Sequence, residues 1–79
     1  MCLAVPMQVI SFQGHNALCE ARGVRREVSL FLLSGTAVVV GDFVLVHVGY
    51  AIQIIAPHEA ELSWQLFEEL TDALDQVHA

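Results

Sequence analysis

The sequence predicts one small, mainly β domain, a barrel or sandwich of short strands followed by a single C-terminal amphipathic helix. Its 79 residues are enough for one hydrophobic core. Between residues 7 and 55, short apolar segments alternate closely with turn signals, a pattern typical of small all-β folds rather than of an α/β sheet. From Pro57 onward the apolar period becomes helical. Residues 1–79 are therefore one domain, with an N-terminal arm (1–6), a β region (7–55) and a helix (57–78).

The β region divides at its turn residues. Its first segment, residues 7–12, alternates apolar and polar side chains imperfectly and ends in turn residues at 13–16. The segments that follow are residues 16–21, 24–32, 38–40, 43–48 and 50–55. Gly49 lies inside an apolar run, where a glycine indicates a bulge or a barrel corner.

The last segment has the signals of a helix that begins at residue 57. Pro57 suits a first turn, and the acids Glu59 and Glu61 favour the N-terminal end of the helix dipole. At 100° per residue the apolar face consists of Leu62, Leu66, Leu70, Ala73, Leu74 and Val77. Trp64 falls on the opposite, acidic side. It is either a loosely packed surface residue or an interface anchor.

The charge of the chain is acidic and uneven. The formal net charge is −6, and the arginines at positions 22, 25 and 26 balance the three acids that precede Pro57. The other six acids follow Pro57. Neither part offers the basic groove that a barrel needs to bind single-stranded nucleic acid, so no nucleic-acid partner is expected. The arginines are most simply a solvated edge that discourages strand pairing.

The apolar run 36–55 is long enough to raise the question of a membrane span. An acid, a histidine and two glycines interrupt it, and no basic residue follows it, so we assign it to strands and expect no membrane partner. The N-terminus has no basic region and meets a proline too early for a secretory signal. With two cysteines in all, the chain is expected in a reducing cytoplasm.

Cys2 is the first candidate for chemistry. Removal of Met1 would leave its thiol beside a free α-amine, and that pair can bind a soft metal without a folded pocket. Pro6 stiffens the exit from the arm, and we expect it to hold the arm off the barrel. The alternative is that the cysteine at position 2 has no function.

His47 lies in an apolar segment, where a histidine is more often a core residue than a metal ligand. Both interpretations stay open, and the second gains weight only if Cys2 lies near it. One cysteine and one histidine are too few for a closed structural zinc site, so an open carrier site fits them better. Cys19 is expected in the core as a small apolar residue. The sequence contains no GxGxxG, P-loop, CxxC or HExxH motif.

Three segments resemble the HypC/HupF family of nickel–iron hydrogenase maturation chaperones. They are Met1-Cys2-Leu3-Ala4-Val5-Pro6, Gly23-Val24-Arg25-Arg26-Glu27-Val28 and Gly41-Asp42-Phe43-Val44-Leu45-Val46-His47-Val48-Gly49-Tyr50-Ala51-Ile52. The resemblance covers the whole chain in order, and its first and last segments together are specific. One departure is Met7, because many members have glycine after the motif proline.

The resemblance implies an OB-like β-barrel over residues 7–55, followed by the helix. It implies a non-enzymatic chaperone that partners a HypD-type scaffold protein while an Fe(CN)2CO group is assembled. The chaperone then delivers this iron fragment to the precursor of the hydrogenase large subunit. Iron is thus a transient cargo, with Cys2 as the residue that engages it and His47 as its companion. Partner contacts are expected at Cys2, Leu3, Ala4, Val5, Pro6, His47 and Trp64.

Two further functions are weighed against this one. An enzyme with Cys2 as nucleophile would need a base near the thiol and a sheltered substrate pocket, and a short arm offers neither. A structural adaptor that binds partners through Trp64 and the helix would differ only in carrying no metal. The oligomeric state stays open, including an exchange of the helix between copies.

Overall fold

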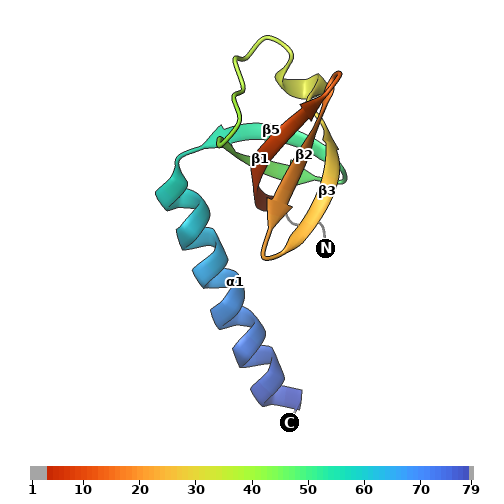
Figure 1. The fold of residues 1–79 in the computed structure, drawn as a ribbon. Helices are drawn as coiled ribbons and strands as arrows, with labels where there is room; N and C mark the ends of the chain where they lie inside the picture. The colour runs from red at the N-terminus through yellow and green to blue at the C-terminus, as the bar shows by residue number, and fades with distance from the viewer. Residues whose placement is uncertain (1–3, 79) are drawn as a thin grey trace.

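The structure, a computed structural model, describes residues 4–78, with side chains described as far as residue 70. Its strands are β1 (Val5–Gln13), β2 (Asn16–Ala21), β3 (Val24–Ser29), β4 (Phe43–His47) and β5 (Tyr50–Ile55). A short 3-10 turn, η1 (Phe31–Leu33), precedes β4, and the helix α1 (Pro57–His78) follows β5. The predicted class, mainly β with one C-terminal helix, is confirmed (Figure 1).

The strands form a closed barrel in the order β1-β2-β3-β5-β4, with β4 paired back to β1. A five-stranded barrel of this kind is OB-like, as expected. All neighbouring strands are antiparallel except β3 and β5, a parallel pair that meets only at Ser29 and Tyr50. A hydrogen bond from the Ser29 amide to the Gly49 carbonyl (2.9 Å) supports this narrow closure.

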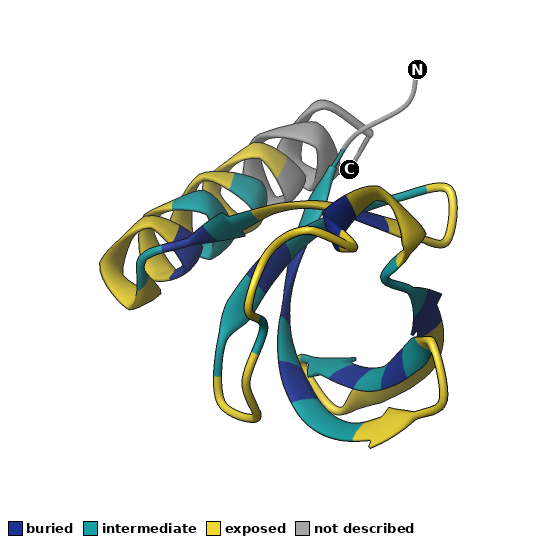
Figure 2. Ribbon diagram, turned by 90° about the horizontal axis from the view of Figure 1, so that it is seen from above, coloured by how far each residue is buried: buried dark blue, intermediate teal, exposed yellow. Residues whose placement is uncertain are grey.

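The core lies inside the barrel and is built from small and medium-sized side chains. It consists of Met7, Val9, Ala17, Cys19, Val28, Leu33, Val44 and Ala51. Figure 2 shows buried residues alternating with more exposed ones along the strands, the pattern expected for a barrel with one face inward. Cys19 is fully buried, as predicted, and burial raises the pKa of its thiol above the ordinary value.

The imperfect alternation of the first β segment comes from a bulge in β1. The register with β2 shifts between Val9 and Ser11, so Ile10 has no partner in β2. Next to the bulge, the backbone of Val9 forms two hydrogen bonds with the turn that precedes β4. Its amide donates to the Asp42 carbonyl (2.8 Å), and its carbonyl accepts from the Gly41 amide (2.9 Å). The bulge thus ties that turn to the middle of β1.

Two predictions are wrong between β3 and β4. The third strand leaves the sheet at Ser29, whose hydroxyl accepts a hydrogen bond from the Phe31 amide (3.2 Å) as the chain turns into η1. The strand expected at residues 38–40 is not formed. There the Asp42 carboxylate accepts a hydrogen bond from the Val39 amide (3.0 Å) and holds the segment in a turn.

The barrel begins at Val5, two residues earlier than expected. Pro6 is not the stiff exit of an arm but a fully buried strand residue paired with Leu45. A proline fits here because the pairing with β2 starts only at Gln8, so no ladder donor is missing on that side. Instead, the Pro6 carbonyl accepts a hydrogen bond from the indole of Trp64 (3.1 Å).

Two hairpins, β2–β3 and β4–β5, are closed by turns of two residues. Both central residues have positive φ: Arg22 (52°) with Gly23 (83°), and Val48 (51°) with Gly49 (82°). This pattern is that of the type I′ turn, whose twist matches the flanking strands. Gly49 was predicted to mark a bulge or a barrel corner; the bulge is wrong, because Gly49 is a residue of the turn between β4 and β5. The bulge in that hairpin lies between Leu45 and Val46.

The start of α1 agrees with its sequence signals. Pro57 is its first residue, and the Glu59 carboxylate accepts a hydrogen bond from the Ala56 amide (3.2 Å). This bond is one half of a capping box, with the glutamate three residues into the helix. No helix in the described part of the chain is long and apolar enough to cross a membrane.

The face of α1 that packs on the barrel is not the predicted leucine face. Ala60 is buried and Trp64 and Phe67 are half-buried, at a spacing that places all three on one side. The exposed fractions on the predicted face are 55% for Leu62, 66% for Leu66 and 55% for Leu70. The apolar periodicity thus located the helix but not its contact surface.

Val48 offers a test of the turn assignment, because a β-branched residue at positive φ is strained. Val48→Asn should raise the free energy of unfolding by about 1 kcal/mol, since Asn tolerates this conformation and Val48 is 75% exposed. Urea denaturation measures the change. Val40→Asn is the matched control, an exposed valine without positive φ, and should be nearly neutral. Equal effects of the two substitutions would contradict the assignment.

Candidate functional site at the mouth of the barrel

The expected site residues within the described chain gather at one end of the barrel. Cys2 and Leu3 lie outside the described residues. Ala4, Val5, His47 and Trp64 are half-buried, whereas Pro6 is buried. β1 begins at this end and β4 finishes there, while α1 reaches it through Trp64. We call this end the mouth of the barrel.

The register between β1 and β4 places the first residue of β1 beside the end of β4. Val5 pairs with Val46, the residue directly before His47. Cys2 precedes Val5 by three positions in the sequence, and three residues span at most about 10 Å when fully extended. The end of β4 that carries His47 thus lies beside the strand that Cys2 precedes.

His47 is the last residue of β4 and pairs with Tyr50 across the β4–β5 turn. Its side chain is half-buried and is not part of the hydrophobic core. No hydrogen bond to the imidazole occurs among the described residues. The core interpretation of His47, which needed a buried imidazole bonded to the backbone, is therefore wrong.

The described residues contain no group of three or more His, Cys, Asp or Glu side chains that could hold a metal ion. His47 therefore belongs to no group of three or more such side chains among the described residues. A metal bound at the mouth through His47 would need further ligands from the N-terminal residues, from a partner or from groups that the metal brings with it.

A hollow of about 350 Å³ opens at the mouth. Its wall is mostly apolar, and it is lined by Val5, Met7, Ala21, Arg22, Val24, Arg26, Val46, Val48 and Trp64. Strand ends and turns from β1, the β2–β3 hairpin and the β4–β5 hairpin surround it. Val5, the residue at which the N-terminal arm joins β1, therefore forms part of the wall of this hollow.

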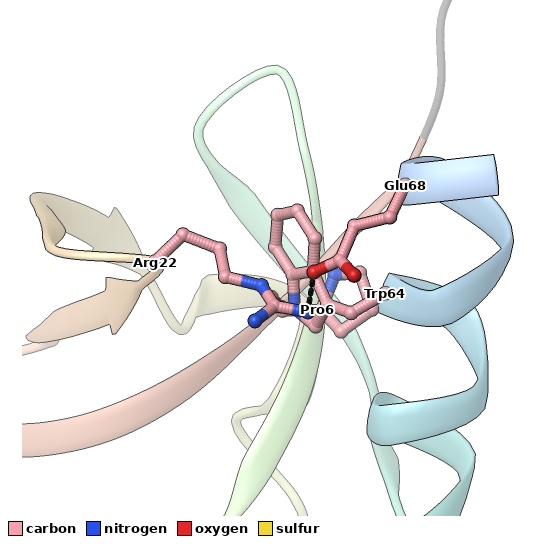
Figure 3. A network of polar contacts seen from close by, with 4 residues as sticks. All are labelled: Pro6, Arg22, Trp64 and Glu68. Atoms are coloured by element: carbon pink, nitrogen blue, oxygen red, sulfur yellow. Dashed lines mark hydrogen bonds and ion pairs between the residues drawn. The ribbon is translucent and has the colours of Figure 1, made fainter. Parts of the chain in front are cut away.

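Three contacts made by Trp64 and its neighbours Arg22 and Glu68 fasten the helix to the mouth (Figure 3). The indole nitrogen of Trp64 donates the hydrogen bond to the Pro6 carbonyl, and the guanidinium of Arg22 lies 5.1 Å from the ring centroid. Arg22 also forms an ion pair with Glu68 one turn further along α1. The ring of Phe67 lies 5.5 Å from that of Trp64. Trp64 is thus an anchor between parts of the same chain.

Arg22 and Arg26 line the hollow, whereas the sequence predicted a solvated edge for both. Alternation carried a signal for Arg26, because Val24, Arg26 and Val28 share one face of β3 and Val28 is in the core. Arg22 gave no comparable signal, since its role depends on a helix contact with Glu68, 46 positions later in the sequence.

Comparison with known proteins gives this geometry a context. The sequence model of the HupF/HypC family matches residues 1–67. The chain belongs to the HupF/HypC family. The match includes both expected metal ligands and the barrel mouth, together with the part of α1 that packs on it.

Relatives from several bacteria agree with this assignment. The hydrogenase maturation factor HypC of Cupriavidus necator is 46% identical over 89% of this chain and 77% of its own length. The hydrogenase expression/formation protein HupF of Bradyrhizobium diazoefficiens is 41% identical over 95% of this chain and 74% of its own. The HypC of Escherichia coli K12 is 32% identical over the whole chain and 92% of its own length.

The contact of Trp64 with Pro6 can be tested by removing the indole donor while keeping an aromatic ring. Trp64→Phe should lower the free energy of unfolding by about 1 kcal/mol, because the Pro6 carbonyl loses its partner. Leu66→Gln is the control on the exposed face and should change stability little. Thermal unfolding followed by circular dichroism measures both. A Trp64→Phe variant as stable as the parent would show that the contact does not anchor the helix.

Proposed function

We propose that this chain is a non-enzymatic chaperone of nickel–iron hydrogenase maturation. It carries an Fe(CN)2CO fragment on Cys2 and His47. It works with a HypD-type scaffold protein, where the fragment is assembled, and passes the fragment to the precursor of the hydrogenase large subunit. Family membership supports the maturation role, and the geometry of the mouth supports the choice of ligands.

The observation that carries this proposal is the register of β1 with β4. It places the root of the Cys2 arm beside the strand end that holds His47. The imidazole there is accessible and has no hydrogen-bond partner among the described residues. A soft thiolate and an imidazole are both suitable ligands for iron.

The small number of ligands suits a carrier. In an Fe(CN)2CO fragment, three coordination positions are already filled, so the protein needs to supply only one or two. A site that supplied four protein ligands would close around the metal and resist its release. The absence of a closed ligand cluster among residues 4–70 fits a fragment that must be handed on.

A structural adaptor without metal is the second candidate, and the exposed leucines of α1 favour it. Leu62, Leu66 and Leu70 offer an apolar surface to a partner whether or not iron is carried. The two candidates differ in the metal content of the protein when it is isolated with its scaffold partner.

Cys2→Ala should abolish the infrared bands of CO and CN that accompany wild-type protein purified anaerobically with its scaffold partner. The reason is that the thiolate is the proposed anchor of the fragment. The fold should be unaffected, because the barrel begins at Val5. Circular dichroism and a melting curve verify the fold.

Cys19→Ala is the matched control, since it removes the other thiol of the chain from the core. This variant should keep the CO and CN bands. A Cys2→Ala protein that retains wild-type bands would refute the carrier function. A wild-type complex that forms without any such bands would favour the adaptor.

His47→Gln should reduce the amount of fragment carried and leave the fold intact. The imidazole is only half-buried and lies outside the core, so the free energy of unfolding should change by less than about 1 kcal/mol. Infrared band intensity per protein and urea denaturation are measured on the same preparation. If His47→Gln loses the bands because the protein unfolds, the proposed role of His47 as an iron ligand is contradicted and its role is structural.

A further inference from the structure

We propose that Arg26 binds the cyanide ligands of the carried iron fragment in the hollow at the barrel mouth. The inference rests on the proposed carrier function and adds to it a third protein group, one that touches the ligands of the iron rather than the iron. It also assigns the hollow as the place where those ligands lie.

The position of Arg26 follows from the alternation of β3. Val28 is 1% exposed and belongs to the core, and Arg26 lies two residues before it on the same face. Arg26 also pairs in register with Cys19, another core residue. Arg26 is itself exposed, because the barrel opens at this point of β3, and its side chain lines the hollow there.

Among the described side chains, Arg26 differs from the other two arginines in having no charge partner. Arg25 is bonded to the Glu20 carboxylate at 2.7 Å, and Arg22 to Glu68. Within residues 4–70, Arg26 makes neither an ion pair nor a side-chain hydrogen bond. The arginine without a charge partner within residues 4–70 lies at the mostly apolar hollow. Its guanidinium N–H groups are available to an anionic acceptor.

The ligands of the fragment match this environment. A metal-bound cyanide carries negative charge on a nitrogen that accepts hydrogen bonds, and arginine is the side chain suited to such acceptors. Carbon monoxide is neutral and a poor acceptor, so it suits an apolar wall such as that formed by Val5, Met7 and Val46. The hollow has a volume of about 350 Å³, whereas a water molecule in the liquid occupies about 30 Å³. The hollow therefore has room for several diatomic ligands.

The hollow is also in the right place for an iron held by Cys2. Val5, three residues from Cys2, forms part of its wall, and so do Val46 and Val48 on either side of His47. His47 itself does not line the hollow. An iron held by Cys2 and His47 would lie at the rim, near the end of β4, and its diatomic ligands would extend into the hollow.

The test is infrared spectroscopy of the scaffold complex, purified anaerobically from cells that make the Arg26→Met variant. The CN bands should shift in frequency, because the hydrogen bond to the cyanide nitrogen is lost. The retained fragment should fall by roughly tenfold, the loss expected for one charge-assisted hydrogen bond. Arg26→Lys keeps the charge without the planar fork and should give an intermediate result.

Arg25→Met is the matched control, because Arg25 is the neighbouring arginine and is already paired with Glu20. Its CN bands should match those of the wild type. Unshifted CN bands and full retention in Arg26→Met would overturn the inference while leaving the carrier function intact. Loss of the scaffold protein with unshifted bands would make Arg26 a partner contact, which also overturns it. A wild-type complex without bands that depend on Cys2 would overturn both proposals.

Discussion

The pairing of β1 with β4 is the interaction on which the rest of the structure depends. It joins segments about forty positions apart, from Val5 with Val46 to Gln8 with Phe43. Such a contact orders a long stretch of chain, so its formation costs more entropy than that of a local hairpin. The pairing closes the barrel around its core and, by the same register, brings the root of the N-terminal arm next to His47. One set of backbone bonds therefore supports both the fold and the candidate site.

The helix completes this arrangement with few contacts. Ala60 allows a close approach to the barrel, and the indole of Trp64 donates a hydrogen bond to the carbonyl of Pro6, which precedes the part of β1 that pairs with β2. The ion pair of Arg22 with Glu68 lies between side chains that are more than half exposed, so it orients the hairpin more than it stabilises the fold. The anchoring therefore depends mainly on Trp64 and its buried neighbours. The contact that anchors the helix is made at Pro6, four positions after Cys2 in the sequence. The helix is therefore fixed to the barrel next to the residue where the N-terminal segment enters β1.

Four features could be predicted from the sequence because they depend on local pattern: the fold class, the strands β1, β2, β4 and β5, the start of α1 and the core position of Cys19. The prediction was wrong where a contact with a residue elsewhere in the fold determines the local structure. Residues 38–40 have β-forming side chains, but Asp42 bonds the Val39 amide and makes a turn. The leucine stripe is the more apolar face of α1, yet the helix packs through Trp64 because the free carbonyl of Pro6 lies on the barrel. No periodicity encodes the position of that carbonyl.

The candidate site shows the same division, with a consequence for its mechanism. Cys2 and His47 stand out by residue type, whereas Arg26 resembles its two neighbouring cations until the pairs of Arg22 and Arg25 are known. A carrier needs tight enough binding to keep its cargo and weak enough coordination to release it. Contacts to the cargo's own ligands meet both needs, because hydrogen bonds to cyanide add affinity without adding a bond to the metal. If the proposed carrier function holds, ligand exchange at iron during transfer would involve only the thiolate and the imidazole, and Arg26 at the mouth would keep the fragment oriented.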